Sequence, residues 1–320
     1  MSLPKVSAII PCYNTRDCVV TAVESALNQA GHPIEVIVVD DGSSDDSADV
    51  VERAFSNDSR VCVIRLPNNQ GPSAARNAGF EAAQGEWIGL LDSDDIWRPN
   101  RVSTLLQHEA DADFIADNLM GFDAIANVET GAVYEELSNR WLNLTDFITP
   151  SAPDRHDFGY LQPLIRRSFL IEHAIRYRVD VRAGEDLLLN LSILAKGGRA
   201  YYVNEPLYVY ATPVGAVSRN ASPHSRSTAD TKPLIQALIE FSEEFKSKLT
   251  SSENSAFKLR LADLRSQAPI GAFHRARTNK RYLEMLFLIA REPIVRRKIF
   301  DRILNKPGNG ISASTSSTNS

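Results

Sequence analysis

The sequence feature that most constrains the fold is the run IEVIVV at Ile34–Val39, in which every residue but Glu35 is apolar. A strand with apolar side chains on both faces is typical of a parallel sheet that helices cover on each side. Mostly apolar runs at 6–10, 61–66 and 87–91 also predict strands. Helical spacing separates them, over Asp17–Gln29, Asp45–Phe55 and Ser73–Ala83. Strands that alternate with helices predict an α/β domain with a mostly parallel central sheet.

Polar clusters follow three of these predicted strands, at 11–14, 40–44 and 92–95. In open parallel sheets, ligands bind beyond the carboxyl ends of the strands. We therefore expect the three clusters to converge on one edge of the sheet. A further predicted strand at 113–117 ends in a carboxylate, that of Asp117.

The most acidic of these clusters lies in the stretch GLLDSDDIWRP, where Asp92, Asp94 and Asp95 directly follow a buried strand. Carboxylates this close repel one another unless a cation lies among them. Mg2+ and Mn2+ are the hard cations that a few carboxylates and phosphate oxygens hold. Because Asp also caps helices, the stretch by itself fits an acidic turn as well as a metal site.

The cluster DDGSS at 40–44 also has two interpretations. A carboxylate at such a strand end can accept a hydrogen bond from a uracil ring or from ribose hydroxyls. The alternative is a simple turn with Asp41–Gly42 at its corner. The chain has no GxGxxG and no GxxxxGK[ST] motif, so neither dinucleotide binding nor Walker-type phosphate binding fits.

Charged residues in two predicted helices complete the candidates. Arg76 fits a bidentate donor to a phosphate or base edge, and equally an ordinary surface arginine. Glu185 and Asp186 precede the apolar helix Leu187–Ala195. A carboxylate there fits a helix cap, and also a rigidly held general base.

The segments between these motifs are less regular. Residues 127–153 are rich in turn formers, which predicts a flexible loop or an insertion over the site. The aromatic stretch HDFGYLQP at 156–163 suits the wall of a binding site. Short strands are expected at 200–203 and 207–210, on either side of Pro206.

Composition excludes several classes of protein. The chain has 320 residues, 43% of them hydrophobic and 23% charged, which is ordinary for a globular protein. A net charge of −5 gives no support to nucleic-acid binding. Three cysteines without CxxC spacing predict reduced thiols, and the first residues show no signal-peptide pattern. We therefore expect a cytoplasmic location, with no stretch long enough to span a bilayer.

The C-terminal part has a different character. Amphipathic helices are predicted at 233–249 and 253–266. The segment 275–306 then carries ten Lys and Arg against three Asp and Glu. Such a basic, partly apolar segment can lie on an anionic membrane, here the cytoplasmic face of the inner membrane. A solvated face on a packed helix is the alternative, and Pro293 interrupts the pattern.

Taken together, five motifs resemble the inverting family-two glycosyltransferases. They are VSAIIPCYN, VIVVDDGSSD, NQGPSAARNAGF, GEWIGLLDSDD and GEDLLL. The resemblance covers about residues 4–220 and implies the GT-A fold. It divides the domain 1–220 into a nucleotide-sugar half, 1–118, and an acceptor half, 119–220. The remainder is then a helical, basic extension at 231–306 and a disordered tail at 307–320.

The resemblance also implies roles for single residues. Pro11 and Tyr13 would line the uracil pocket, and Asp41 would bind the uracil ring. Asp94 would bind Mn2+ or Mg2+, and Asp186 would be the general base. The other implied donor contacts are Arg76 near the base or phosphates, Asp92 near the ribose, and Ser93 beside it. The implied acceptor contacts are Asp117, Tyr160 and Glu185. Family members often carry a histidine after the second short strand, but residues 211–218 contain none, and whether His224 substitutes is left open.

ADNL at 116–119, HDFGYLQP and RYRVDVRAGED narrow the resemblance to glucosyltransferases of bacterial succinoglycan-type exopolysaccharide assembly. That implies a UDP-sugar donor, with glucose as the favoured hexose, and a lipid-linked saccharide acceptor. The motif QxxRW is absent, which disfavours a polymer-extending synthase. A nucleotidyltransferase is disfavoured because 11–17 is not a glycine-rich loop. The alternative function is a non-catalytic nucleotide-sugar-binding partner of a polysaccharide assembly complex, and the presence of Asp94 and Asp186 favours the enzyme.

Overall fold

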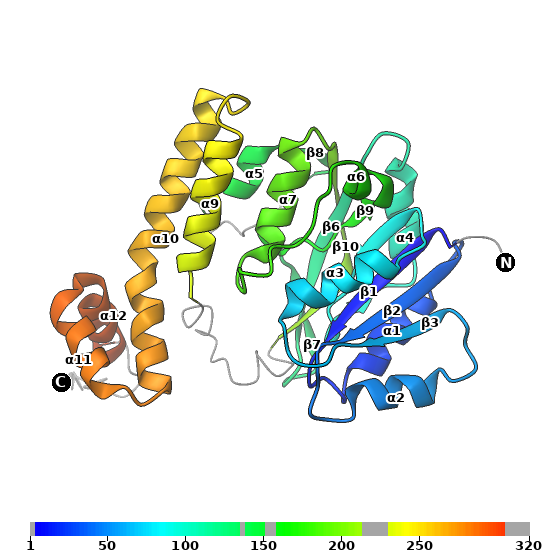
Figure 1. The fold of residues 1–320 in the computed structure, drawn as a ribbon, viewed down its shortest axis with the longest axis horizontal. Helices are drawn as coiled ribbons and strands as arrows, with labels where there is room; N and C mark the ends of the chain where they lie inside the picture. Colours follow the sequence, from blue (N-terminus) through cyan, green and yellow to red (C-terminus); the bar gives the residue numbers. More distant parts are fainter. Residues whose placement is uncertain (1–3, 135–137, 151–157, 213–229, 305–320) are drawn as a thin grey trace, which may run out of the picture.

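The computed structural model describes residues 4–134, 138–150, 158–212 and 230–304. Within these ranges, ten strands form one sheet that helices flank (Figure 1). The order of the strands is β3-β2-β1-β4-β9-β6-β10-β5, with β7 added beside β6 and β8 beside β10. The predicted α/β class is confirmed. The expected tail at 307–320 lies outside the described residues.

The first half of the chain forms the parallel part of the sheet. Its strands are β1 (Val6–Cys12), β2 (Ile34–Asp40), β3 (Val61–Arg65) and β4 (Trp87–Leu90). Its helices are α1 (Val19–Leu27), α2 (Ser47–Ala54) and α3 (Pro72–Ala82). In the register of β1, Cys12 pairs with Asp40 and Ile9 pairs with Leu90. The polar clusters after these strands therefore share one edge of the sheet, as predicted.

The sequence predicted that the first strand ends before Pro11. In the structure, β1 continues through Pro11 to Cys12. Pairing with β4 stops at Ile9, and beyond that residue β1 pairs with β2 alone. On the side of β4, Pro11 therefore has no neighbouring strand to which it would have to donate an N–H group. Strands tolerate proline at such positions.

The second half of the chain adds mostly antiparallel strands. They are β5 (Ile96–Trp97), β6 (Phe114–Asp123), β7 (Val128–Ala132), β8 (Arg140–Leu142), β9 (Leu164–Arg166) and β10 (Ala200–Thr212). The helices of this half are α4 (Arg101–Leu105), α5 (Leu144–Ile148), α6 (Arg167–Glu172) and α7 (Glu185–Ala195). Strand β9 pairs antiparallel with both β4 and β6, and so joins the two halves of the sheet.

Two expectations for this half were wrong. The stretch 127–153 is not one loop, because it contains β7, β8 and α5. Helix α5 begins at a capping box in which Asn143 and Asp146 each bond the other's backbone. The two short strands around Pro206 are one strand, β10, whose pairing with β6 shifts register at the proline.

The C-terminal helices stand beside this domain (Figure 1). They are α9 (Lys232–Glu244), α10 (Ser251–Thr278), α11 (Tyr282–Arg291) and α12 (Pro293–Leu304). Helix α9 packs on α7, α10 packs on α5, and α11 and α12 pack on α10 and on each other. Pro293 starts α12, where its missing N–H costs no hydrogen bond. Among the described helices, none is long and apolar enough to cross a bilayer.

Candidate active site

The turn after β2 is built around Asp41, which is 2% exposed. Its two carboxylate oxygens accept hydrogen bonds from the backbone N–H groups of Gln70 and Gly71, each at 2.7 Å. Gly42 has φ +69°, and a Cβ there would lie 2.7 Å from the backbone of Asn68. The turn with Asp41–Gly42 at its corner is therefore present, and it fixes the segment that leads into α3. The contact of Asp41 with uracil stays a prediction.

The loop after β1 is tied to the same turn. The backbone N–H of Asn14 donates to Ser43 Oγ at 3.0 Å, and the Asn14 side-chain oxygen accepts from the N–H of Ser44 at 2.8 Å. This leaves Tyr13 at the surface, with 37% of the residue exposed, next to the half-buried Pro11. An exposed ring on a fixed loop can stack on a planar base.

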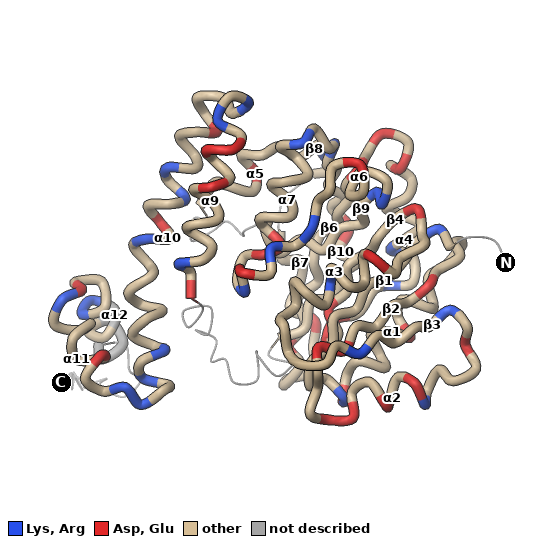
Figure 2. Tube along the Cα trace, in the orientation of Figure 1, with Lys and Arg blue, Asp and Glu red and all other residues tan. Residues whose placement is uncertain are grey.

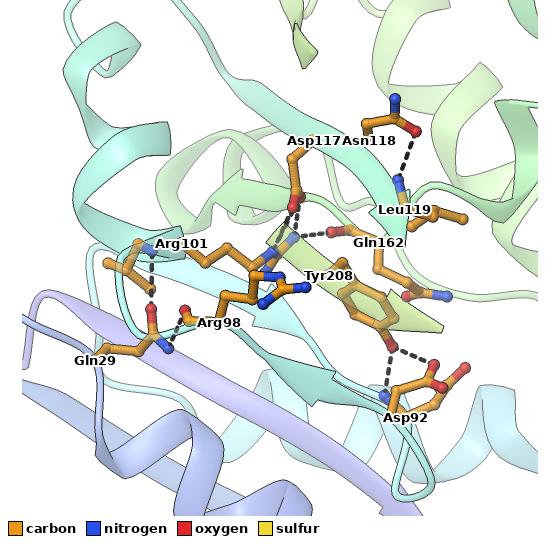
Figure 3. Close-up of polar contacts among 11 residues, drawn as sticks. Gln29, Asp92, Arg98, Arg101, Asp117, Asn118, Leu119, Gln162 and Tyr208 are labelled. Atoms are coloured by element: carbon orange, nitrogen blue, oxygen red, sulfur yellow. Dashed lines mark hydrogen bonds and ion pairs between the residues drawn. The ribbon is translucent and has the colours of Figure 1, made fainter. Parts of the chain in front are cut away.

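The DSDD turn after β4 is anchored to β10 through Tyr208 (Figure 3). The Tyr208 hydroxyl accepts from the N–H of Asp92 at 3.1 Å and donates to the Asp95 carboxylate at 2.7 Å. Asp95 also accepts from the N–H of Ala211 at 2.8 Å. Burial raises the pKa of Asp95 well above its usual range, and the charges of Asp94 and Asp92 add to this effect. Asp95 is thus an internal anchor of the turn.

A buried ion pair lies next to the ring of Tyr208 (Figure 3). The Arg101 guanidinium binds both oxygens of Asp117, at 2.7 and 3.1 Å, and it also donates to the backbone carbonyl of Gln162. It lies 4.7 Å from the Trp97 ring centroid and 5.3 Å from that of Tyr208. Asp117, expected to contact the acceptor, is 1% exposed. The structure places it in the core, where it binds the Arg101 guanidinium that lies over the ring of Tyr208.

Arg76 joins the acidic motifs that lie far apart in the sequence. Its guanidinium is 2.7 Å from Asp92, 3.2 Å from Glu185 and 3.5 Å from Asp186. The residue is 3% exposed, so the interpretation as a surface arginine was wrong. One cation therefore holds the start of α7 against the DSDD turn. The predicted contact of Arg76 with the nucleotide remains a prediction.

Asp186 is placed at the start of α7 by Gly184, which has a left-handed φ of +84°. The Tyr177 hydroxyl donates to Asp186 Oδ1 at 2.8 Å. Burial raises the pKa of Asp186 to about 7 although Arg76 lowers it, and the carboxylates of Glu185 and Asp92 raise it further. The side chain keeps 18% exposure. A carboxylate with a pKa near neutrality that still reaches solvent can act as a general base.

The DSDD turn offers few ligands for a metal ion. Asp92 and Asp94 are half-buried oxygen donors on one turn. Within the described residues, no three His, Cys, Asp or Glu side chains form a group that would enclose a metal. Mg2+ and Mn2+ are commonly held by one or two carboxylates that substrate phosphates and water complete. The donor set therefore fits a metal that binds together with a diphosphate.

The remaining predicted residues differ in how far they reach the surface. Ser93 is 5% exposed and Glu185 is 9% exposed, whereas Tyr160 lies at the surface with 36% exposure. Sequence reasoning missed Tyr177 and Tyr208, which carry the hydrogen bonds to Asp186 and to the DSDD turn. Tyr208 belongs to no motif, and Tyr177 lies in RYRVDVRAGED without a role assigned to it, since a tyrosine in a loop or a strand has no local sequence signal for such a contact.

The chain is similar to proteins of known class. Residues 7–156 match the model of Glycosyl transferase family 2. Two relatives from Rhizobium meliloti are succinoglycan biosynthesis proteins. ExoO is 38% identical over 68% of this chain and 63% of its own length. ExoU is 36% identical over 72% of this chain and 68% of its own length. The chain thus spans less than two thirds of ExoO.

Two further similarities concern the donor and the fold. UDP-Glc:alpha-D-GlcNAc-diphosphoundecaprenol beta-1,3-glucosyltransferase WfaP of Escherichia coli is 30% identical over 67% of this chain and 80% of its own. The crystal structure of S. aureus TarS 1-349 in complex with UDP-GlcNAc aligns with a TM-score of 0.56. It is 20% identical and covers 92% of both chains. The fold is therefore of the GT-A type.

The chain belongs to glycosyl transferase family 2. Its relatives act in the biosynthesis of exopolysaccharides and related glycans.

Proposed function

We propose that the protein transfers glucose from UDP-glucose to a hydroxyl group of a lipid-linked saccharide, with inversion at the anomeric carbon. The observation that carries this proposal is the position of Asp186. Its carboxylate has a pKa of about 7 and pairs with the same Arg76 side chain that binds Asp92 of the DSDD turn. A base is thereby fixed beside the motif that the family uses for the donor.

In the proposed reaction, Asp186 accepts the proton of the acceptor hydroxyl while that oxygen attacks the anomeric carbon. The bond between the sugar and the diphosphate breaks as the new bond forms. The base must act on the face opposite the leaving group, as in inverting glycosidases, so an α-linked donor gives a β-linked product. Tyr177 orients the carboxylate by its hydrogen bond, and Arg76 keeps the carboxylate in place.

Asp94 would hold Mg2+ or Mn2+, which would supply positive charge to the departing diphosphate, and Asp92 would lie near the ribose. Tyr13 and Pro11 would contact the uracil. Support for the donor comes from WfaP, whose name specifies UDP-glucose, and from TarS, which was crystallised with UDP-GlcNAc. The name of WfaP also specifies a diphosphoundecaprenol acceptor, which supports a lipid-linked acceptor here.

The substitution Asp186→Asn tests the proposal because it keeps the shape of the side chain and removes its ability to accept a proton. We expect transfer of labelled glucose to bacterial lipid extract to fall by about 10²–10⁴-fold. Calorimetric binding of UDP with Mn2+ should be unchanged. Asp180→Asn is the matched control, since the Asp180 side chain is 58% exposed and pairs with Arg178 in the same loop.

Normal transfer by Asp186→Asn would contradict the base assignment. If wild-type protein binds UDP but transfers none of a panel of UDP-sugars, the chain is instead a non-catalytic nucleotide-sugar-binding protein.

A further inference from the structure

Helix α11 exposes a face that globular proteins normally bury. Leu283, Leu286 and Phe287 are 86%, 57% and 58% exposed, and their spacing of three and four residues puts them on one side of the helix. Tyr282 beside them is 59% exposed, and Phe300 of α12 is 60% exposed. Clustered large apolar side chains on a surface mark a site of interaction with a protein or a membrane.

The opposite side of α11 explains why this face is not needed for the fold. Met285, Leu288 and Ile289 are half-buried, and the helix packs on α10 and α12. The helix therefore carries apolar residues on both sides, and within the part of the chain that the structure describes only one side packs on other helices. Helices that are apolar all round are found buried, in a protein core or in lipid.

Basic side chains surround the exposed face. Between residues 275 and 297 there are seven Lys and Arg and two Glu, although the whole chain has a net charge of −5. Arg277, Lys280, Arg281 and Arg291 are exposed. Figure 2 shows this concentration of basic residues at the end of the molecule that α11 and α12 form, away from the sheet. Apolar residues within a basic surface are the pattern of helices that lie in a membrane interface.

We infer that α11, with the exposed part of α12, docks the protein on an anionic lipid surface. The side chains of Leu283, Leu286 and Phe287 would enter the boundary between headgroups and acyl chains. The surrounding Lys and Arg would contact anionic headgroups, each adding to the attraction. The inference does not depend on the donor or the acceptor, so it stands or falls separately from the proposed function.

The charge of this surface selects lipid over a second copy of the chain. A symmetric dimer places the same patch of each copy face to face. The basic residues around α11 would then face one another, and like charges repel across such an interface. An anionic membrane instead complements both the apolar stripe and its basic border.

Flotation with vesicles tests the inference on the intact chain. We expect the protein to float with vesicles of phosphatidylcholine and phosphatidylglycerol, and to float much less with pure phosphatidylcholine. The double variant L283S/F287S should lose flotation on the anionic vesicles. The control I125S/I171S removes two exposed apolar side chains elsewhere, which are 82% and 55% exposed, and should float like wild type.

The charge contribution has its own variant, R277Q/K280Q. Less salt should be needed to release this variant from anionic vesicles than to release wild type. Unchanged UDP affinity in all variants shows that the catalytic domain is intact. Equal flotation of L283S/F287S and wild type would overturn the inference. So would a dimer, detected by light scattering without lipid, that L283S/F287S abolishes while wild type fails to float.

Discussion

The Tyr177 hydroxyl donates a hydrogen bond to Asp186 Oδ1 at 2.8 Å, and Tyr177 is itself only 3% exposed. The ring of the same tyrosine lies 5.2 Å from the Arg76 guanidinium carbon. A loop residue thus contacts both the proposed base and the cation that holds it. Because this hydrogen bond stabilises the charged carboxylate, it is one of the influences that lower the pKa of Asp186.

The pH dependence of the reaction follows from this contact. A base must be ionised to act, so kcat/KM should rise tenfold per pH unit below about 7, the pKa of Asp186, and level off above it. Tyr177→Phe removes the hydrogen bond to the carboxylate and should move this limb upward by about one pH unit. A pH profile of glucose transfer measures the shift. A variant that lowers the plateau without moving the limb would show that Tyr177 does not tune Asp186.

The edge of the sheet at which the site lies could be predicted from the sequence, because apolar runs and the polar residues after them are local signals. IEVIVV before DDGSS locates β2 and its polar turn, and WIGLL before DSDD locates β4 and its acidic turn. Parallel pairing then brings the ends of these strands together whatever the rest of the chain does. Arg76 could be recognised as a candidate from the residues around it in the sequence. Its burial could not be predicted from them.

The contacts that complete the site could not be predicted, because they depend on pairings between distant segments. In the sequence Asp117 follows an apolar run just as Asp92 does, but in the structure it lies inside β6, where the packing of α4 against β6 and β10 brings Arg101 to it. Tyr208 lies beyond Pro206, where the sequence predicts a broken strand. Its alignment with the DSDD turn depends on the register shift in β10.

The metal ligand is tested most directly by Asp94→Ala. Loss of this carboxylate removes a hard oxygen donor from the turn. In the presence of Mn2+, UDP should therefore bind the variant no more tightly than it binds wild type in EDTA. Titration calorimetry with and without Mn2+ gives both affinities. Asp111→Ala is the control, since that carboxylate is 70% exposed and pairs with Arg199 at the surface. Full metal-dependent affinity in Asp94→Ala would remove Asp94 from the metal site.

The anchor of the DSDD turn is tested by Tyr208→Phe. The variant leaves the buried Asp95 carboxylate without its hydroxyl donor, which should lower the free energy of unfolding by about 1–3 kcal/mol. Because the same hydroxyl accepts from the N–H of Asp92, Mn2+-dependent UDP affinity should fall as well. Tyr201→Phe on the same strand is the control, as its ring packs on His108 and Trp141 rather than on the turn. Equal effects of the two variants on UDP affinity would contradict the anchoring role.

The final prediction concerns the contact between the C-terminal helices and the start of α7. Leu234 of α9 is 5% exposed, and a Cβ on Gly184 would lie 2.6 Å from its Cδ2 atom. The same helix is tied to the loop before α7 by an ion pair at 2.6 Å between Glu240 and Arg178. The left-handed turn that presents Asp186 therefore rests against α9. Removing the extension would expose this turn, so point variants are the informative ones.

Leu234→Ala should lower the free energy of unfolding by about 2–5 kcal/mol, as for other buried leucines. Because the cavity lies against Gly184, kcat should also fall, whereas UDP affinity should hold since the nucleotide half of the sheet is untouched. Leu238→Ala is the matched control, with a fully buried leucine on the same helix. It should cost similar stability and leave kcat unchanged in assays below the unfolding transition. If both variants lower kcat equally, α9 supports the fold as a whole and does not position Asp186.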